Sequence, residues 1–173
     1  MTDVRERPAV PRIVAATARD VPLILELIRA LAEYERLAHE VVATEDVLRE
    51  TLFGARPGAE VVIAYVGDEA VGFALFFHNY STFLGRPGLA LEDLFVRPAW
   101  RGRGIGRRLL AHLAALAVER RCGRFEWQVL DWNEDAIRVY RGVGAVPMSD
   151  WTTYRLTGEA LHALAREAEQ ASS

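Results

Sequence analysis

The segment Leu91–Leu110 reads LEDLFVRPAWRGRGIGRRLL and predicts a strand, a glycine-rich basic loop and a helix in succession. Residues 91–96 form an apolar run that carries two acids and is typical of a strand within a sheet. Pro98 ends this strand, because proline has no N–H to donate to a ladder. After the loop, apolar side chains recur at the spacing of an amphipathic helix. They are Ile105, Leu109, Leu110, Leu113, Leu116 and Ala117.

The loop between the strand and the helix predicts an anion site. Its glycines allow the backbone to turn tightly and bring N–H groups close to a ligand. These donors stand at a helix start, where unpaired amides and the helix dipole favour a phosphate. The loop lacks both the Gly-Lys-Ser/Thr ending of a Walker A loop and the glycine spacing of a dinucleotide-binding turn. We therefore expect a phosphorylated cofactor of another kind, with a flexible surface turn as the alternative.

Length and composition favour a single globular domain. The chain has 173 residues, of which 51% are hydrophobic, and its net charge of -3 gives no overall attraction to nucleic acid. No apolar run approaches the roughly 20 residues that span a bilayer, and the first residues include no apolar signal segment. The lone Cys122 cannot form an internal disulfide. These features predict a cytoplasmic protein with no membrane partner.

The pattern along the chain predicts a mixed α/β (α+β) fold. The expected strands are residues 13–16, 61–66, 71–80, 89–96, 125–130 and 151–156, and the expected helices cover residues 21–34, 45–53, 105–117 and 134–141 and a segment after Thr157. Asp20, Thr44 and Asn133 are suited to cap three of these helices. The scattered histidines show no metal-ligand spacing, so we expect no metal site. The order predicts a mixed, mostly antiparallel sheet flanked by helices.

Three motifs carry a resemblance to a known family. They are Leu91–Val96, the loop R-x-x-G-x-G at 101–106, and Asp131-Trp132-Asn133-Glu134 running on through Tyr140 to Ala145. Together they resemble the diamine (spermidine/spermine) N-acetyltransferases of the GNAT superfamily, over roughly residues 13–156. The resemblance implies a GNAT fold, acetyl-CoA as cosubstrate and a homodimer. It divides the chain into a flexible tail (1–11), an N-acetyltransferase domain (12–158) and a C-terminal helix and tail (159–173).

The resemblance also implies a catalytic pair. A primary amine has a pKa near ~10.4, so it must lose a proton before it attacks a thioester. In the family, the glutamate matching Glu92 takes that proton, through water. The tyrosine matching Tyr140 returns a proton to the CoA thiolate. The alternatives are that Glu92 is an ordinary exposed strand residue and that Tyr140 packs against the sheet.

Cofactor and substrate residues follow from the same resemblance. The cofactor residues are Leu94, Phe95 and Val96 through their backbone, Arg101, Gly102, Arg103, Gly104, Ile105, Gly106 and Arg107 in the loop, and Asn133. The substrate residues are Tyr34, Glu35, Ser81, Glu92 and Trp127. Further acids that could surround a cationic substrate are Glu33, Asp93, Asp131 and Glu134.

The identity of the acceptor is less defined. Polyamine-preferring members carry an acid in the loop before the central strand, where this chain has residues 80–83, Tyr-Ser-Thr-Phe. The chain thus resembles the branch that acts on thialysine and related small amines. Two alternatives stay open: an N-acetyltransferase of proteins or peptides, and an acyl-CoA-binding module that performs no transfer.

Overall fold

The computed structural model describes residues 10–170, and the chain divides into two units, Met1–Asp131 and Trp132–Ser173. Most of the expected N-terminal tail, residues 1–9, and the last three residues of the expected C-terminal tail lie outside the described part. Within the described part, no helix is long and apolar enough to cross a bilayer, and no group of three or more His, Cys, Asp or Glu side chains is placed to hold a metal ion.

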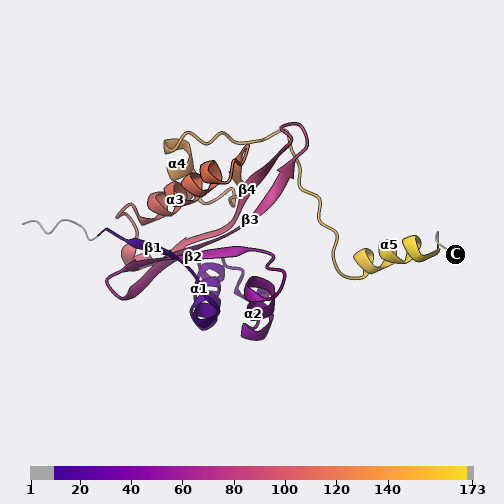
Figure 1. Ribbon diagram of the computed structural model, residues 1–173, viewed down its shortest axis with the longest axis horizontal. Coiled ribbons are helices and arrows are strands. Elements are labelled where there is room, and N and C mark those ends of the chain that lie inside the picture. The colour runs from indigo at the N-terminus through magenta and orange to yellow at the C-terminus, as the bar shows by residue number, and fades with distance from the viewer. Residues whose placement is uncertain (1–9, 171–173) are drawn as a thin grey trace, which may run out of the picture. The chain divides into compact units, whose positions relative to one another are not determined.

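The first unit contains a five-stranded sheet in the order β1-β2-β3-β4-β5 (Figure 1). The strands are β1 Arg12–Ala15, β2 Glu60–Val66, β3 Glu69–Ser81, β4 Arg86–Val96 and β5 Phe125–Trp127. The first three pairings are antiparallel, and β4 and β5 pair in parallel. The predicted mixed, mostly antiparallel sheet of an α/β fold is confirmed.

Three helices cover this sheet, with α1 and α2 on one face and α3 on the other (Figure 1). They are α1 Val21–Tyr34, α2 Glu45–Phe53 and α3 Ile105–Glu119. The prediction that Thr44 caps α2 is confirmed, because its side chain accepts a hydrogen bond from the backbone N–H of Val47 at 3.3 Å. Asp20 directly precedes α1 as expected, but its carboxylate accepts from the N–H of Thr17 at 2.7 Å and does not cap that helix.

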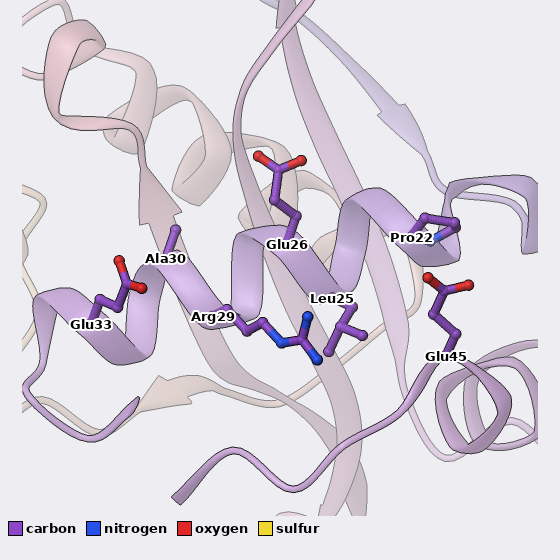
Figure 2. Close-up of a pocket in the computed structure, with 7 residues that line it drawn as sticks. All are labelled: Pro22, Leu25, Glu26, Arg29, Ala30, Glu33 and Glu45. Carbon is purple, nitrogen blue, oxygen red and sulfur yellow. The ribbon is translucent and has the colours of Figure 1, made fainter. Parts of the chain in front are cut away.

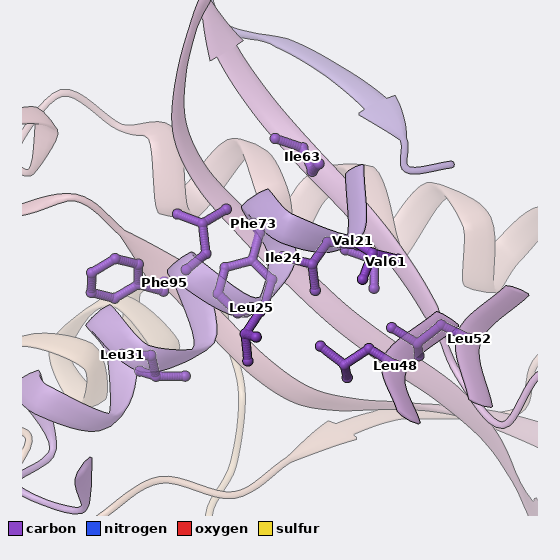
Figure 3. Packing of buried hydrophobic residues seen from close by; sticks show 11 residues of the cluster. Val21, Ile24, Leu25, Leu31, Leu48, Leu52, Val61, Ile63, Phe73 and Phe95 are labelled. Carbon is purple, nitrogen blue, oxygen red and sulfur yellow. The ribbon is translucent and has the colours of Figure 1, made fainter. Parts of the chain in front are cut away.

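The core between α1, α2 and the sheet fixes the orientation of α1. Figure 3 shows apolar side chains of the two helices packed against the strands. Phe95 of β4 lies in this core and is 3% exposed. An ion pair adds to it at the edge: the guanidinium of Arg97, just after β4, donates to the Glu26 carboxylate on α1 at 2.7 Å. The ion pair therefore ties the middle of α1 to the end of β4.

The second unit contains two helices, α4 Glu134–Gly142 and α5 Gly158–Gln170. Asn133 caps α4 as predicted, and its side-chain oxygen accepts from the N–H of Ala136 at 3.3 Å. The expected strand at 151–156 is wrong, since this segment has no regular secondary structure. A strand requires a neighbouring ladder for its backbone groups, and no strand is described in this unit. Strand β5 also ends earlier than expected, at Trp127 instead of residue 130.

Candidate active site

The ladder between β4 and the edge strand β5 is short. Their parallel ladder consists of three pairs, Leu89 with Phe125, Ala90 with Glu126 and Leu91 with Trp127. Beyond Leu91, β4 continues to Val96 and is paired only with β3. The side of β4 that faced β5 is therefore no longer paired with a strand over residues 92–96.

A β-bulge lies at the same point. In the antiparallel ladder with β3, Leu91 pairs with Phe76 and Asp93 pairs with Leu75, so Glu92 is an extra residue in β4. A bulge bends its strand and redirects side chains, and bulges are common beside active sites. Glu92 is exposed. The predicted base thus stands where the two strands part, next to Trp127 at the end of the β5 ladder.

The backbone of β4 beyond the bulge presents hydrogen-bonding groups to the open side. The N–H of Arg97 donates to the Val71 carbonyl on β3 at 2.8 Å. Because antiparallel neighbours alternate in direction, Leu94 and Val96 turn their backbone groups away from β3, while Phe95 turns its own toward β3. The backbone N–H and C=O of Leu94 thus face the open side, where an extended ligand could pair with them as an added strand. The carbonyl of Val96 accepts a hydrogen bond from Nε of Arg101 at 2.9 Å.

Three carboxyl groups influence one another near the end of α1. Burial first, and then the charges of Glu92 and Glu35, together raise the pKa of Asp93 to about 6. Burial also raises the pKa of Glu35, which follows directly after α1. From the sequence, Asp93 is expected only to be one of several acids around the substrate. Its position within an apolar strand indicates that the side chain could be buried. The groups that surround it, however, depend on the bulge.

The glycine loop has the conformation that its sequence predicts. Gly102 and Gly104 have φ angles of 73° and 77°, in the left-handed region where other residues are strained. Gly104 is the N-cap of α3 and has no side chain with which to cap it. The first-turn amides of a helix have no intrahelical acceptor, so they point out of the helix toward any ligand there. A Cβ at Gly106 would lie 3.7 Å from the Leu94 side chain, so this turn lies beside β4.

Two loop arginines lie over aromatic rings. The guanidinium of Arg101 is 4.1 Å from the ring centroid of Tyr34, the last residue of α1. The guanidinium of Arg103 is 4.6 Å from the ring of Trp100, whose Nε1 donates to Glu69 at 2.9 Å. The structure therefore brings the predicted substrate residue Tyr34 against the predicted cofactor loop.

Ser81 is not brought to this cluster. It is the last residue of β3, pairs with Arg86, and its Oγ accepts from the N–H of Leu84 at 3.3 Å. Ser81 lies five positions along β3 from Phe76, which corresponds to about 17 Å at ~3.4 Å per residue. Ser81 thus shapes the β3–β4 turn. Asn133 and Tyr140 belong to the second unit, in which Tyr140 is partly buried on α4.

Of the residues expected around the substrate, an open hollow beside α1 contains only Glu33 (Figure 2). Its lining is Pro22, Leu25, Glu26, Arg29, Ala30, Glu33 and Glu45. Glu26 is already bound by Arg97. The lining of the hollow includes neither an unpaired side of a strand nor a glycine-rich loop. We therefore place the candidate active site at the bulge of β4.

Known proteins resemble the chain over most of its length. A mouse thialysine N-epsilon-acetyltransferase is 36% identical over 165 residues, covering 89% of this chain and 96% of its own. The L-ornithine N5-acetyltransferase of Arabidopsis thaliana is 35% identical over 198 residues, covering 88% of this chain and 87% of its own. Among solved structures, an integron cassette protein from the V. cholerae mobile metagenome has a TM-score of 0.76 at 26% identity, covering 90% of this chain and 97% of its own.

The family assignment has two independent supports. The model of the Acetyltransferase (GNAT) family matches residues 24–145, which include most of α1 and the whole of β4, the glycine loop and α4. The curated relatives extend the match beyond this range at both ends of the alignment, as their coverage shows. The chain therefore belongs to the Acetyltransferase (GNAT) family and is an acetyl-CoA-dependent N-acetyltransferase.

Proposed function

We propose that the chain transfers the acetyl group of acetyl-CoA to the primary amine of a small cationic molecule, such as a thialysine-like amino acid, a diamine or a polyamine. The observation that carries the proposal is the position of Glu92, on a bulge where β4 parts from β5. Two relatives support the substrate class, since their names give thialysine and L-ornithine as acceptors. Both are amino acids with an amine at the end of the side chain.

The cofactor would bind along the open side of β4. Its pantetheine arm carries amides that can pair with the backbone of Leu94 and the N–H of Val96 as an added strand does, whereas the backbone groups of Phe95, expected to take part, face β3. Its pyrophosphate would lie on the backbone amides of residues 101–107, at the start of α3, where the helix dipole favours negative charge. Asn133 would contact the cofactor while it also caps α4. In this arrangement the thioester lies toward the bulge and the phosphates toward α3.

The reaction would proceed by direct attack. Glu92 takes a proton from the ammonium group through a water molecule, and the free amine attacks the thioester carbonyl. The tetrahedral intermediate then collapses and its C–S bond breaks. CoA leaves with a proton from the Tyr140 hydroxyl, and the second proton lost by the attacking nitrogen restores that hydroxyl. The step needs no metal and no acyl-enzyme. The role of Tyr140 rests on its match to the family pattern at residues 131–145.

The substrate would lie between the end of α1 and the end of β5. Glu35, Glu92 and Asp93 give this region negative charge, which favours a cationic amine over a neutral one. Tyr34 and Trp127 would supply aromatic walls. The acceptors named for the two relatives are amino acids with one side-chain amine, so a single acceptor amine on a short chain is the proposed substrate.

The same family pattern leads us to infer a cytoplasmic homodimer. The single Cys122 agrees with a reducing compartment. Residues 151–156 are apolar and aromatic in part, without regular secondary structure, and are the segment we assign to the subunit contact. Sedimentation equilibrium of the protein and of a Trp151→Glu variant would test this, with a monomeric variant as the expected result.

A panel of acceptors tests the proposed function. Purified protein is incubated with acetyl-CoA and L-thialysine, L-ornithine, putrescine, spermidine or short peptides with free N-termini, and released CoA is measured with a thiol reagent. We expect release above hydrolysis with thialysine or ornithine. Acetylation of peptides alone would favour a protein N-acetyltransferase. Binding of acetyl-CoA with no transfer to any acceptor would favour a non-catalytic module.

A further inference from the structure

The side chain of Arg101 connects three elements of the first unit. Its Nε donates to the carbonyl of Val96, the last residue of β4, at 2.9 Å. Its guanidinium lies 4.1 Å from the ring centroid of Tyr34, the last residue of α1. Arg101 itself is part of the loop that leads to α3. One side chain thus joins the cofactor loop to β4 and to α1.

Arg103, two residues further along the same loop, has a different environment. Its guanidinium lies 4.6 Å from the ring of Trp100, which belongs to the same loop segment. That contact stays within the segment between β4 and α3. The contact of Arg101 with Tyr34 instead crosses to a helix that precedes the loop by more than sixty positions in the sequence. A contact of this kind transmits order between two parts of a site.

We propose that Arg101 is a positioning residue that couples the cofactor loop to Tyr34 and so to the amine side of the active site. This inference rests on the proposed function. When a pyrophosphate orders residues 101–107, the stacked guanidinium restrains Tyr34 and the adjacent Glu35 as well. Coupling between binding sites is reciprocal, so a bound amine strengthens the binding of the cofactor by the same factor. The Arg101 side chain then acts through Tyr34 and not as a ligand of the phosphates.

The coupling can be measured directly with CoA and L-thialysine, a pair that cannot react. Titration calorimetry gives the Kd of thialysine with and without saturating CoA, and the ratio is the coupling factor. In the unmodified protein we expect a factor of about three to five, the size of one exposed cation–π contact. Arg101→Ala and Tyr34→Leu should each bring the coupling factor close to one. The double variant should have the same coupling factor as either single variant. Tyr34→Phe keeps the aromatic ring and should keep the factor.

Controls separate coupling from folding and from phosphate binding. Arg12→Ala removes a guanidinium from above Tyr65, at 5.1 Å, on the β1–β2 pair, and should leave the coupling factor unchanged. The Kd of CoA alone should change by less than about twofold in Arg101→Ala. A tenfold loss of CoA affinity in that variant would make Arg101 a phosphate ligand and overturn the proposal. So would a coupling factor that survives in both Arg101→Ala and Tyr34→Leu.

The proposed function can fail separately. If the unmodified protein transfers no acetyl group to thialysine or to any acceptor of the panel, the function is wrong before any variant is compared, and the coupling falls with it. If the unmodified protein is active and only the coupling factor is unaffected by the variants, the coupling alone is wrong.

Discussion

Leu91 and Trp127 form the last pair of the parallel ladder between β4 and β5, and the next residue of β4, Glu92, has no partner in the ladder with β3. The end of one ladder and the bulge in the other thus coincide. An opening in the sheet alone would expose only backbone groups, and a bulge alone would only bend the strand. Because they coincide, the carboxylate of Glu92 lies beside a stretch of β4 whose backbone is unpaired on one side.

Glu92→Gln tests the role of this carboxylate. Glutamine keeps the size of the side chain but cannot take a proton, so kcat should fall by about 10²- to 10⁴-fold at pH 7. The residual rate should rise with pH as more of the amine is free, because the acceptor has a pKa near ~10.4. The measurement is a pH–rate profile of CoA release from pH 6.5 to 10.

Glu92 is exposed, so the substitution should leave thermal unfolding nearly unchanged. If the rate and the pH profile of Glu92→Gln match those of the unmodified protein, Glu92 is an ordinary strand residue and another group must take the proton.

Gly104→Ala tests the cofactor loop against a matched glycine elsewhere. Gly104 has a φ of 77°, and Gly67 in the β2–β3 turn has a φ of 58°. A Cβ at either position meets no atom within 4 Å, so both substitutions cost stability through the backbone alone. We expect about 1 kcal/mol of destabilisation for each.

Only Gly104→Ala should weaken the binding of acetyl-CoA, because Gly104 precedes the amides that are proposed to hold the pyrophosphate. Chemical denaturation measures the first effect and calorimetry the second. Equal acetyl-CoA affinity in the two variants, at equal loss of stability, would remove Gly104 from the cofactor site.

Local signals made much of the fold predictable from the sequence. Thr44 and Asn133 cap the helices that they were expected to cap, because a cap depends on residues within one turn. The left-handed glycines at 102 and 104 follow from the loop composition for the same reason. The sheet type also followed, since strand order and hairpin turns are read from nearby residues.

Features that depend on pairing between distant segments were not predictable. The bulge at Glu92 exists only in the register of β4 against β3, and it determines the environment of Asp93. The segment 151–156 has the composition of a strand but no described partner strand in its unit, so composition misled. Ser81 was expected near the substrate, whereas the length of the β3–β4 hairpin carries it away from Glu92.

Tyr140→Phe tests the proposed acid. The change removes one hydroxyl and keeps the ring, so packing on α4 should be largely retained. As a general acid, Tyr140 would contribute about 10²-fold or more to kcat and little to the binding of acetyl-CoA. Stopped-flow rates of acetyl transfer and the Kd of acetyl-CoA are the measurements. An unchanged kcat with a lowered melting temperature would assign Tyr140 to packing instead.

Asp93→Asn tests the electrostatics of the carboxyl cluster through the pH dependence of stability. The pKa of Asp93 is raised from 3.8 to about 6 in the folded protein, first by burial and then by Glu92 and Glu35. Between these two pH values the folded state binds a proton more tightly than the unfolded chain does, so the Asp93 contribution to stability falls as pH rises through this window. Above the window, the ionised side chain costs at most about 3 kcal/mol.

Asp93→Asn should therefore raise the free energy of unfolding by about 1–3 kcal/mol at pH 7.5 and lose this gain at pH 3.5. Urea denaturation at both pH values measures it, with Asp68→Asn in the β2–β3 turn as the control that should stay within about 0.5 kcal/mol. A gain that is the same at both pH values would show that charge burial at Asp93 is not its cause.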